Sequence, residues 1–111
     1  MLDRLTGPLE HYMDLVSMRQ KLVTSNIANA ETPGYKTQDL DFQSSLESAL
    51  ENGAPRRIEV AGLISRNDGN NVDLDREARL LAENALRFNI ASSLLRSSLQ
   101  QVKEAIQGGK S

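Results

Sequence analysis

Residues 74–106 read LDREARLLAENALRFNIASSLLRSSLQQVKEAI, and apolar side chains return every seven positions along this stretch. Two interleaved rows with this spacing are typical of a coiled-coil seam on one long helix. Gly108-Gly109 predicts the end of the helix near Gln107, at a length of roughly 50 Å. The first row consists of Leu74, Leu81, Phe88, Leu95 and Val102, and the second, offset by four positions, of Ala78, Ala85, Ser92, Leu99 and Ile106.

The start of this long helix is predicted at Asp73. Its carboxylate is a suitable N-cap, and Asp75 and Glu77 place negative charge in the first turn, where the helix dipole favours it. The segment from Ser65 to Val72 is polar and predicts turns, with NDGNN, residues 67–71, at its centre.

A second amphipathic helix is predicted near the N-terminus, from Leu5 to Ala30. Its apolar residues recur at three and four positions, which is the spacing of one helix face, and Pro8 is acceptable in a first turn. A further apolar row widens this face and predicts contacts on more than one side. The main row consists of Leu5, Leu9, Tyr12, Val16, Val23, Ile27 and Ala30, and the further row of Leu15, Met18 and Leu22.

The first helix is expected to end before Pro33, which disfavours helical geometry in the preceding residue. Pro33 and Gly34 fit the central positions of a type II turn from Thr32 to Tyr35. Beyond the turn, the apolar spacing predicts a short helix that Asn52-Gly53 would end, and residues 56–60 alternate weakly, as in a strand. The short helix carries Phe42, Leu46, Ala49 and Leu50.

These elements predict a mainly α fold, in which the two terminal helices form an antiparallel, coiled-coil-like pair. The expected divisions are an N-terminal helix at residues 1–31, a turn and outward-facing middle region at 32–72, and a C-terminal helix at 73–111. The first helix, at about 25 residues, covers only part of the second helix's seam. The remaining apolar surface predicts assembly with other subunits.

The composition argues against several other classes of protein. A net charge of −2 favours neither nucleic acid nor an anionic membrane as partner, and the absence of cysteine excludes disulfides and cysteine-ligated zinc. We expect no cleavable signal peptide, because the N-terminus lacks a basic and then apolar region. No stretch approaches the roughly 18 apolar residues of a membrane span.

Two segments could suggest chemistry, and neither is favoured. His11 is the only histidine and lacks the partners of a zinc site or a catalytic triad. Residues 67–73 look like a calcium loop, but aligning Gly69 with the loop glycine places Ile64 at the first ligand position. We therefore expect no enzyme activity, no metal and no cofactor.

Residues 25–36, SNIANAETPGYK, resemble the N-terminal signature of the flagellar rod and hook protein family. Three further stretches, DLDF at 39–42, DGNNVDLDRE at 68–77 and AENALRF at 82–88, are similar to the proximal rod proteins within that family. The middle of the chain carries no such likeness and is short for a family member. The signature residues at and before the turn are Asn26, Asn29, Thr32, Pro33, Gly34 and Tyr35.

The resemblance implies a structural subunit of the flagellar basal-body rod. Such a subunit is exported through the flagellar type III apparatus into the periplasm, where it contacts its own copies, other rod subunits and the basal-body adaptor at the export gate. The terminal helices would then pack within and between subunits. The residues expected at these contacts are Leu9, Tyr12, Val16, Val23 and Ile27 on the first helix, and Leu74, Leu81, Phe88, Leu95, Leu99, Val102 and Ile106 on the second.

One alternative explains the apolar periodicity equally well. A coiled-coil adaptor or export chaperone would use the same seam to bind a partner helix without polymerising. That alternative does not account for the signature at residues 25–36.

Overall fold

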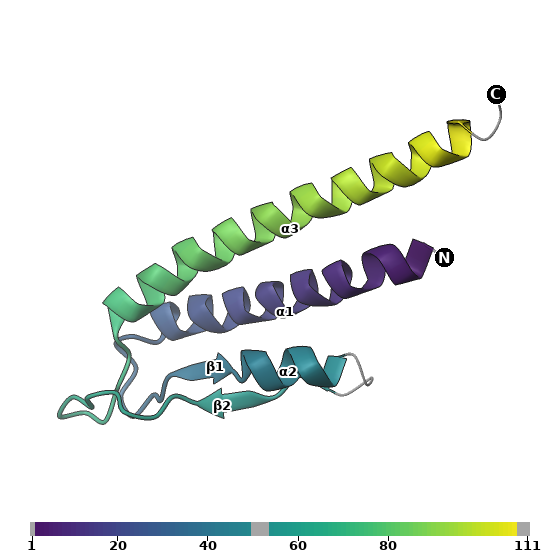
Figure 1. Ribbon diagram of the computed structural model, residues 1–111. Coiled ribbons are helices and arrows are strands. Elements are labelled where there is room, and N and C mark those ends of the chain that lie inside the picture. Colours follow the sequence, from purple (N-terminus) through teal and green to yellow (C-terminus); the bar gives the residue numbers. More distant parts are fainter. Residues whose placement is uncertain (1, 50–53, 109–111) are drawn as a thin grey trace.

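The computed structural model describes residues 2–49 and 54–108, and it confirms a mainly α fold. Two long helices run antiparallel, and a small region containing one short helix and two strands lies beside them (Figure 1). The helix ends that are close to the chain termini lie at one end of the molecule, and the loops that join α1 to β1 and β2 to α3 lie at the other. The elements are α1 (Leu2–Ala28), β1 (Gln38–Leu40), α2 (Phe42–Ala49), β2 (Arg57–Glu59) and α3 (Leu74–Gly108).

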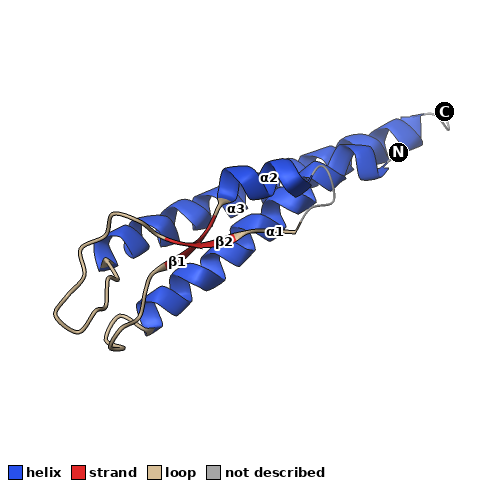
Figure 2. Ribbon diagram, turned by 90° about the horizontal axis from the view of Figure 1, so that it is seen from below, coloured by secondary structure: helices blue, strands red, loops and turns tan. Residues whose placement is uncertain are grey.

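The molecule is elongated, with extents of 70 × 26 × 17 Å. Its radius of gyration is 18.3 Å, whereas a compact chain of this length would have about 13 Å. Helix α1 lies between α3 and the middle region in Figure 1. Figure 2, a view from below, shows the strands and α2 in front of the helix pair. At 35 residues, α3 is longer than α1, which has 27, as the sequence predicted.

The observed ends of the two long helices agree with the predicted ends, except that α1 begins earlier than predicted. The side chain of Asp73 caps α3, since its Oδ1 accepts hydrogen bonds from the backbone N–H groups of Asp75 and Arg76. Helix α1 begins at Leu2, earlier than expected, so Pro8 lies in its second turn. The helix continues through Pro8 with one backbone hydrogen bond fewer, because proline has no N–H.

The turn after α1 is the predicted one. The N–H of Tyr35 donates to the carbonyl of Thr32 at 3.2 Å, and Gly34 has φ of 75°, as the third residue of a type II turn requires. Helix α2 and strand β2 confirm the short helix and the strand that the sequence predicts. The expected stop of the short helix at residues 52–53, together with Leu50, lies outside the described residues.

Strand β1 was not predicted from the sequence. It pairs antiparallel with β2, in a register that places Asp39 opposite Ile58. Its three residues, QDL, are too few to show an alternating pattern. Pairing with β2 and contacts with α1 define this strand.

A small apolar core joins α1 to the middle region. Leu15 and Leu22 of α1 pack with Leu40 of β1, and Met18, Phe42 and Leu46 surround them. This confirms that the second apolar row of α1 makes contacts on its own side. The ring of Phe42 also meets the edge of Tyr12 at a centroid distance of 5.8 Å. The middle region is therefore anchored on α1 mainly through α2 and β1.

Candidate assembly interface

Five charged or polar side chains join α1, β1 and α3 at the loop end of the helix pair. We call Arg19, Asn26, Asp39, Arg76 and Glu77 the polar junction. Asp39 binds two guanidinium groups, with Arg19 Nε at 3.0 Å from one oxygen and Arg76 at 2.6 Å from the other. Arg76 also pairs with Glu77 at 2.8 Å. One strand carboxylate thus connects both long helices.

Asn26 is the centre of this junction and has no exposed surface. Its Oδ1 accepts the backbone N–H of Gln38 at 3.0 Å, and its Nδ2 donates to the carbonyl of the same residue at 2.8 Å. The side chain therefore bonds β1 as a neighbouring strand would. Nδ2 donates also to Glu77 at 3.1 Å, and Oδ1 accepts from the hydroxyl of Tyr35 at 2.9 Å.

The two carboxylates of the polar junction differ in their affinity for protons. Burial alone would raise the pKa of Asp39, but the hydrogen bonds from Arg19, from the backbone of Leu40 and from Arg76 outweigh it, so that this pKa lies below its ordinary value. Burial dominates at Glu77 and raises its pKa, against the hydrogen bond from Asn26 and the charge of Arg76. Oε2 of Glu77 is buried without a hydrogen-bond partner within the described residues.

A second set of contacts holds the turn after α1 against the loop before α3. The amide of Asn70, which is fully buried, donates to the carbonyls of Asn29 and Thr32 at 2.9 and 2.8 Å. Oδ1 of Asn71 accepts the backbone N–H of Thr37 at 2.7 Å. The stretches at 25–36 and 68–77, which carry the family resemblance, are therefore bonded to each other.

Two glycines meet in this contact. Gly34 and Gly69 both have positive φ, 75° and 86°, and the N–H of Gly34 donates to the carbonyl of Asp68 at 2.8 Å. A Cβ placed on Gly69 would lie 3.4 Å from the Cα of Gly34, whereas a Cβ on Gly34 would meet nothing within 4 Å. Both positions favour glycine because their φ is positive. Position 69 favours it also because a side chain there would press against Gly34.

The contact residues predicted on α1 have different surroundings. Val16 and Val23 are each 1% exposed and belong to the core of this chain. Leu9 and Tyr12 are half-buried, and Ile27 is 38% exposed. Val16 and Val23 therefore pack within the chain, whereas Leu9, Tyr12 and Ile27 retain exposed surface that a partner could contact.

The predicted seam of α3 is not the face that this chain buries. The buried residues of α3 are Glu77, Asn84 and Ala91, which recur every seven positions but three positions after the first predicted row. Glu77 bonds Asn26, Asn84 is polar, and Ala91 is small and 2% exposed. Seven-residue spacing alone did not show which of two adjacent rows faces α1.

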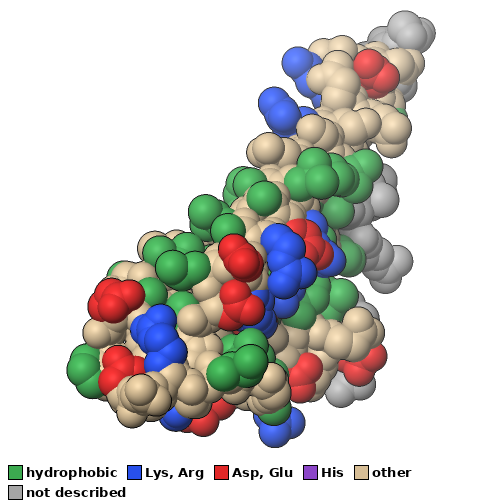
Figure 3. All heavy atoms as spheres, turned by 90° about the vertical axis from the view of Figure 1, so that its left-hand side faces the viewer, with side chains coloured by type: hydrophobic (Ala, Val, Ile, Leu, Met, Phe, Trp, Pro, Cys, Tyr) green, Lys and Arg blue, Asp and Glu red, His purple; other side chains and the backbone are tan. Residues whose placement is uncertain are grey.

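The apolar rows of α3 are consequently left at the surface. Leu95 and Val102 are half-buried, and the other five predicted first- and second-row contact residues are exposed. Hydrophobic side chains are visible at several places along the elongated surface in Figure 3, beside closely spaced acidic and basic groups. The five exposed residues are Leu74, Leu81, Phe88, Leu99 and Ile106.

Sequence reasoning missed the polar junction. In the sequence, Asp39 and Arg76 are distinguished only as parts of stretches that resemble a family. An available signal was the row of Glu77, Asn84 and Ala91, whose seven-residue spacing equals that of the seam.

No helix among the described residues is sufficiently long and apolar to span a membrane.

Comparison with known proteins identifies relatives along almost the whole chain. The family described as flagella basal body rod protein matches residues 16–36, which include the second half of α1 and the turn after it. The flagellar basal body rod protein FlgB of Salmonella typhimurium is 31% identical over 137 aligned positions, covering 98% of this chain and 99% of the relative.

Two further relatives carry the same name. FlgB of Escherichia coli K12 is 29% identical over 137 positions, covering 98% of this chain and 99% of the relative. FlgB of Cereibacter sphaeroides is 36% identical over 107 positions, covering 81% and 84%. Since an alignment of 137 positions exceeds the 111 residues of this chain, the longer relatives contain residues that it lacks.

Proposed function

This chain belongs to the FlgB family of flagellar basal-body rod proteins, as a structural subunit of the rod, and we propose that assembly buries the apolar rows of α3 between subunits. In this proposal the seam of one copy packs against α1 and α3 of its neighbours. The contact residues on α1 are Leu9, Tyr12 and Ile27, with Val16 and Val23 serving the contact inside each subunit. Those on α3 are Leu74, Leu81, Phe88, Leu95, Leu99, Val102 and Ile106.

The observation that carries this proposal is the exposure of large apolar side chains along α3. Phe88 is 39% exposed, and Leu74 and Ile106 are 51% and 59% exposed. Exposure of these apolar side chains to water is unfavourable, and contact with another subunit would bury them. Completing the burial of each side chain would contribute about 1 kcal/mol, so several together can support a stable contact.

The divisions of the chain acquire separate roles in this proposal. The segments 1–31 and 73–111, which contain α1 and α3, pack into the rod, and residues 32–72 form a middle region that faces outward. The polar junction and the contact of Asn70 with the turn hold the middle region at a defined position on the helix pair. Gly34 and Gly69 permit the reversals of the chain at this position.

The proposed location is the periplasmic part of the basal body, reached through the flagellar type III export apparatus. The proposed partners are copies of the same chain, other rod subunits and the basal-body adaptor at the export gate. The family membership supports the rod as the location and rod components as partners. The export route and the adaptor follow from the family resemblance of residues 25–36 and 68–77.

We propose further that the chain performs no catalysis. The two carboxylates with shifted pKa values, Asp39 and Glu77, are engaged with Arg19, Arg76 and Asn26. These contacts bind secondary-structure elements to each other, which is a structural use of buried charge. A coiled-coil adaptor or export chaperone is the alternative, and it would use the seam of α3 without forming a rod.

The test replaces Phe88 by serine in a strain that carries this chain as its sole copy. Phe88→Ser should abolish rods and motility, and because the side chain is 39% exposed, circular dichroism of the isolated chain is expected to show retained helices. The matched control is Ile64→Ser, since Ile64 is 92% exposed and lies in the middle region. Electron microscopy of isolated basal bodies supplies the measurement.

Three outcomes would count against the proposal. Normal rods with Phe88→Ser would refute the proposed contact. Loss of rods with both variants would show that exposed apolar residues matter generally, and would also count against the seam. A strain lacking the chain that still builds a complete rod would remove the rod function for this protein.

A further inference from the structure

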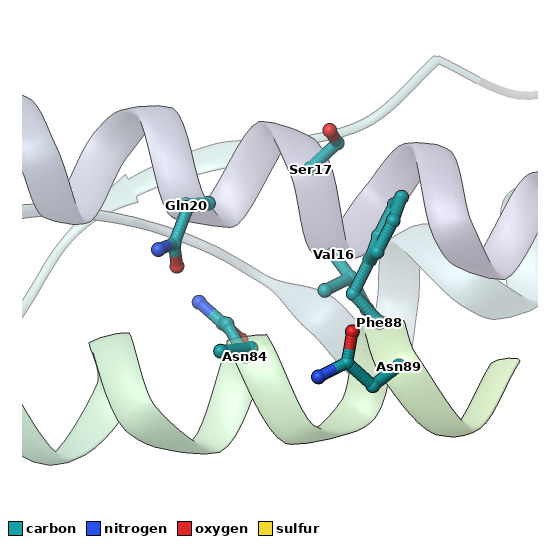
Figure 4. Close-up of a pocket in the computed structure, with 7 residues that line it drawn as sticks. Val16, Ser17, Gln20, Asn84, Phe88 and Asn89 are labelled. Atoms are coloured by element: carbon teal, nitrogen blue, oxygen red, sulfur yellow. The ribbon is translucent and has the colours of Figure 1, made fainter. Parts of the chain in front are cut away.

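Two buried side-chain amides face each other between α1 and α3. Gln20 of α1 and Asn84 of α3 line a groove of about 310 Å³, together with Val16, Ala85 and Phe88. Figure 4 shows the carboxamides of Gln20 and Asn84 pointing toward one another across the space between the helices. The two helices therefore present matching polar groups to each other at this point.

Sequence spacing places the two amides at the same level of the helix pair. Gln20 comes six residues before Asn26, and Asn84 comes seven residues after Glu77. Since α1 and α3 run antiparallel and Asn26 bonds Glu77, residues displaced equally in opposite directions face each other, here about 10 Å from that bond. Gln20 and Asn84 thus form a second polar contact between the helices, about two turns beyond the polar junction.

This second contact lacks the hydrogen bonds that the polar junction has. Oε1 of Gln20 and both Nδ2 and Oδ1 of Asn84 are buried without a hydrogen-bond partner within the described residues. Asn84 is 1% exposed, so its amide is shielded from bulk water. A buried polar group without a partner is unfavourable, and the penalty exceeds the net gain from an ordinary hydrogen bond. The helix pair therefore gains stability if these atoms bond each other.

We propose that Gln20 and Asn84 close as an amide latch between α1 and α3. Nδ2 of Asn84 is a donor that faces the acceptor Oε1 of Gln20, while Oδ1 of Asn84 accepts from Nε2 of Gln20. Two N–H···O bonds side by side satisfy all three buried atoms at once. Closure requires only small rotations of the two side chains and narrows the groove. No group from outside the chain takes part.

The closed latch restrains the segment of α3 that carries the proposed rod contacts. Asn84 lies three residues after Leu81 and four before Phe88, both of which are exposed. The polar junction bonds only the first turn of α3, through Arg76 and Glu77. The latch extends this restraint by about two turns and keeps Phe88 in a fixed direction. This role in assembly rests on the proposed rod function, whereas the latch itself does not.

Replacement of one amide at a time distinguishes a closed latch from amides that stay unpaired. If the latch closes, Gln20→Met or Asn84→Leu leaves the other amide without its partner, and the equilibrium constant of unfolding should rise about tenfold. If the amides never pair, each change removes an unfavourable buried group, and this constant should fall. Urea denaturation of the full chain gives the sign. A fall with both variants would overturn the latch.

Two double variants separate loss of the bond from altered packing. Gln20→Met combined with Asn84→Leu should return the unfolding constant to within about threefold of the wild type, because both polar groups are then absent. The exchange of Gln20→Asn with Asn84→Gln keeps two carboxamides and should do the same. Gln101→Met, at an exposed position of α3, is the control and should change nothing. Losses that simply add in both double variants would contradict the proposal.

Nuclear magnetic resonance of the ¹⁵N-labelled chain observes the latch directly. The side-chain NH₂ groups of Gln20 and Asn84 should share a nuclear Overhauser cross-peak and should exchange with water much more slowly than that of Asn89, which is exposed. Slow exchange without the cross-peak would show burial without pairing, and would overturn the latch. The cross-peak should reappear in the variant with exchanged amides.

Basal bodies from a strain with this chain as its sole copy test the role in assembly. Gln20→Met should reduce the number of rods, and the exchanged amides should restore it. Normal rods with Gln20→Met, in a chain whose latch the other measurements confirm, would overturn the assembly role alone. Normal rods with Phe88→Ser would instead refute the proposed rod contact and leave the latch intact. The two failures are therefore distinguishable.

Discussion

The amide of Asn26 donates to a carboxylate oxygen of Glu77 at 3.1 Å, although 51 positions separate the two residues in sequence. Both residues are fully buried, and each has a further partner, the backbone of Gln38 for Asn26 and the guanidinium of Arg76 for Glu77. The two stretches that resemble the rod and hook family, at 25–36 and 68–77, are therefore parts of one structural unit. Together, these stretches hold α1, β1 and α3 in contact.

Replacing Asn26 by alanine should lower the free energy of unfolding by about 2–4 kcal/mol, because it removes bonds to Gln38, Tyr35 and Glu77 and leaves these groups unpaired. The control is Asn67→Ala in an exposed loop, with an expected change within about 0.5 kcal/mol. Urea denaturation followed by circular dichroism measures both. Equal effects of the two changes would contradict a central role for Asn26.

Alanine at Gly34 or Gly69 should destabilise the chain by about 1 kcal/mol or more, because both glycines have positive φ. The loss should be greater at Gly69, where the added Cβ approaches the Cα of Gly34 to 3.4 Å. Gly7→Ala is the matched control. It lies in α1 with nothing within 4 Å of the new Cβ, and should stabilise the helix by up to about 1 kcal/mol.

The same glycines allow a test of assembly. We expect Gly34→Ala to reduce the number of rods more than the amount of exported chain, because the turn positions the middle region rather than aiding transport. Fractionation of cells and counting of basal bodies give the two quantities. Rods at normal number, with a measurably destabilised chain, would argue against this role of the turn.

Stability should depend on pH through the two carboxylates in opposite directions. The pKa of Glu77 is raised above 4.5, so the folded chain holds a proton that the unfolded chain has lost, and stability falls as pH rises from 4.5 through the raised pKa. The pKa of Asp39 is lowered below 3.8. Its contribution is complete above 3.8 and is lost as pH falls towards the folded-state pKa.

This dependence is measured by urea denaturation between about pH 3 and pH 7, in the wild-type chain and in Glu77→Gln. The variant should lose the decrease in stability just above pH 4.5 and retain the loss below 3.8. Glu83→Gln, on an exposed part of α3, serves as control and should follow the wild type. Parallel curves for wild type and Glu77→Gln would show that Glu77 does not titrate in this range.

Phe42→Ala should lower the free energy of unfolding by about 2–4 kcal/mol, because the ring contacts both long helices. It packs against Leu15 and Leu22, meets Tyr12 edge-on, and has the guanidinium of Arg87 at 5.7 Å from its centroid. Loss of the ring should free the middle region before the helices separate. Hydrogen exchange resolves the two events, and simultaneous exchange of all elements would contradict this order.

Much of the fold followed from local pattern. Asp73, Pro33 and Gly34 act within a few residues of themselves, so the start of α3 and the turn from Thr32 to Tyr35 could be predicted from the sequence. The excess length of α3 over α1 followed from periodicity alone. Strand β1 could not be predicted, because its three residues become a strand only by pairing with β2 and bonding the side chain of Asn26.

The sequence by itself determined two antiparallel helices of unequal length, the turn after α1 and the N-cap of α3. It also determined that α3 carries more apolar side chains than α1 can cover. Tertiary structure decided which row of α3 faces α1. Apolar periodicity favoured the row of Leu81 and Phe88. The bonds of Glu77 to Asn26 and of Arg76 to Asp39 instead orient the helix so that its buried residues are Glu77, Asn84 and Ala91. A buried carboxylate requires its partners, whereas an exposed leucine can still be covered by another subunit.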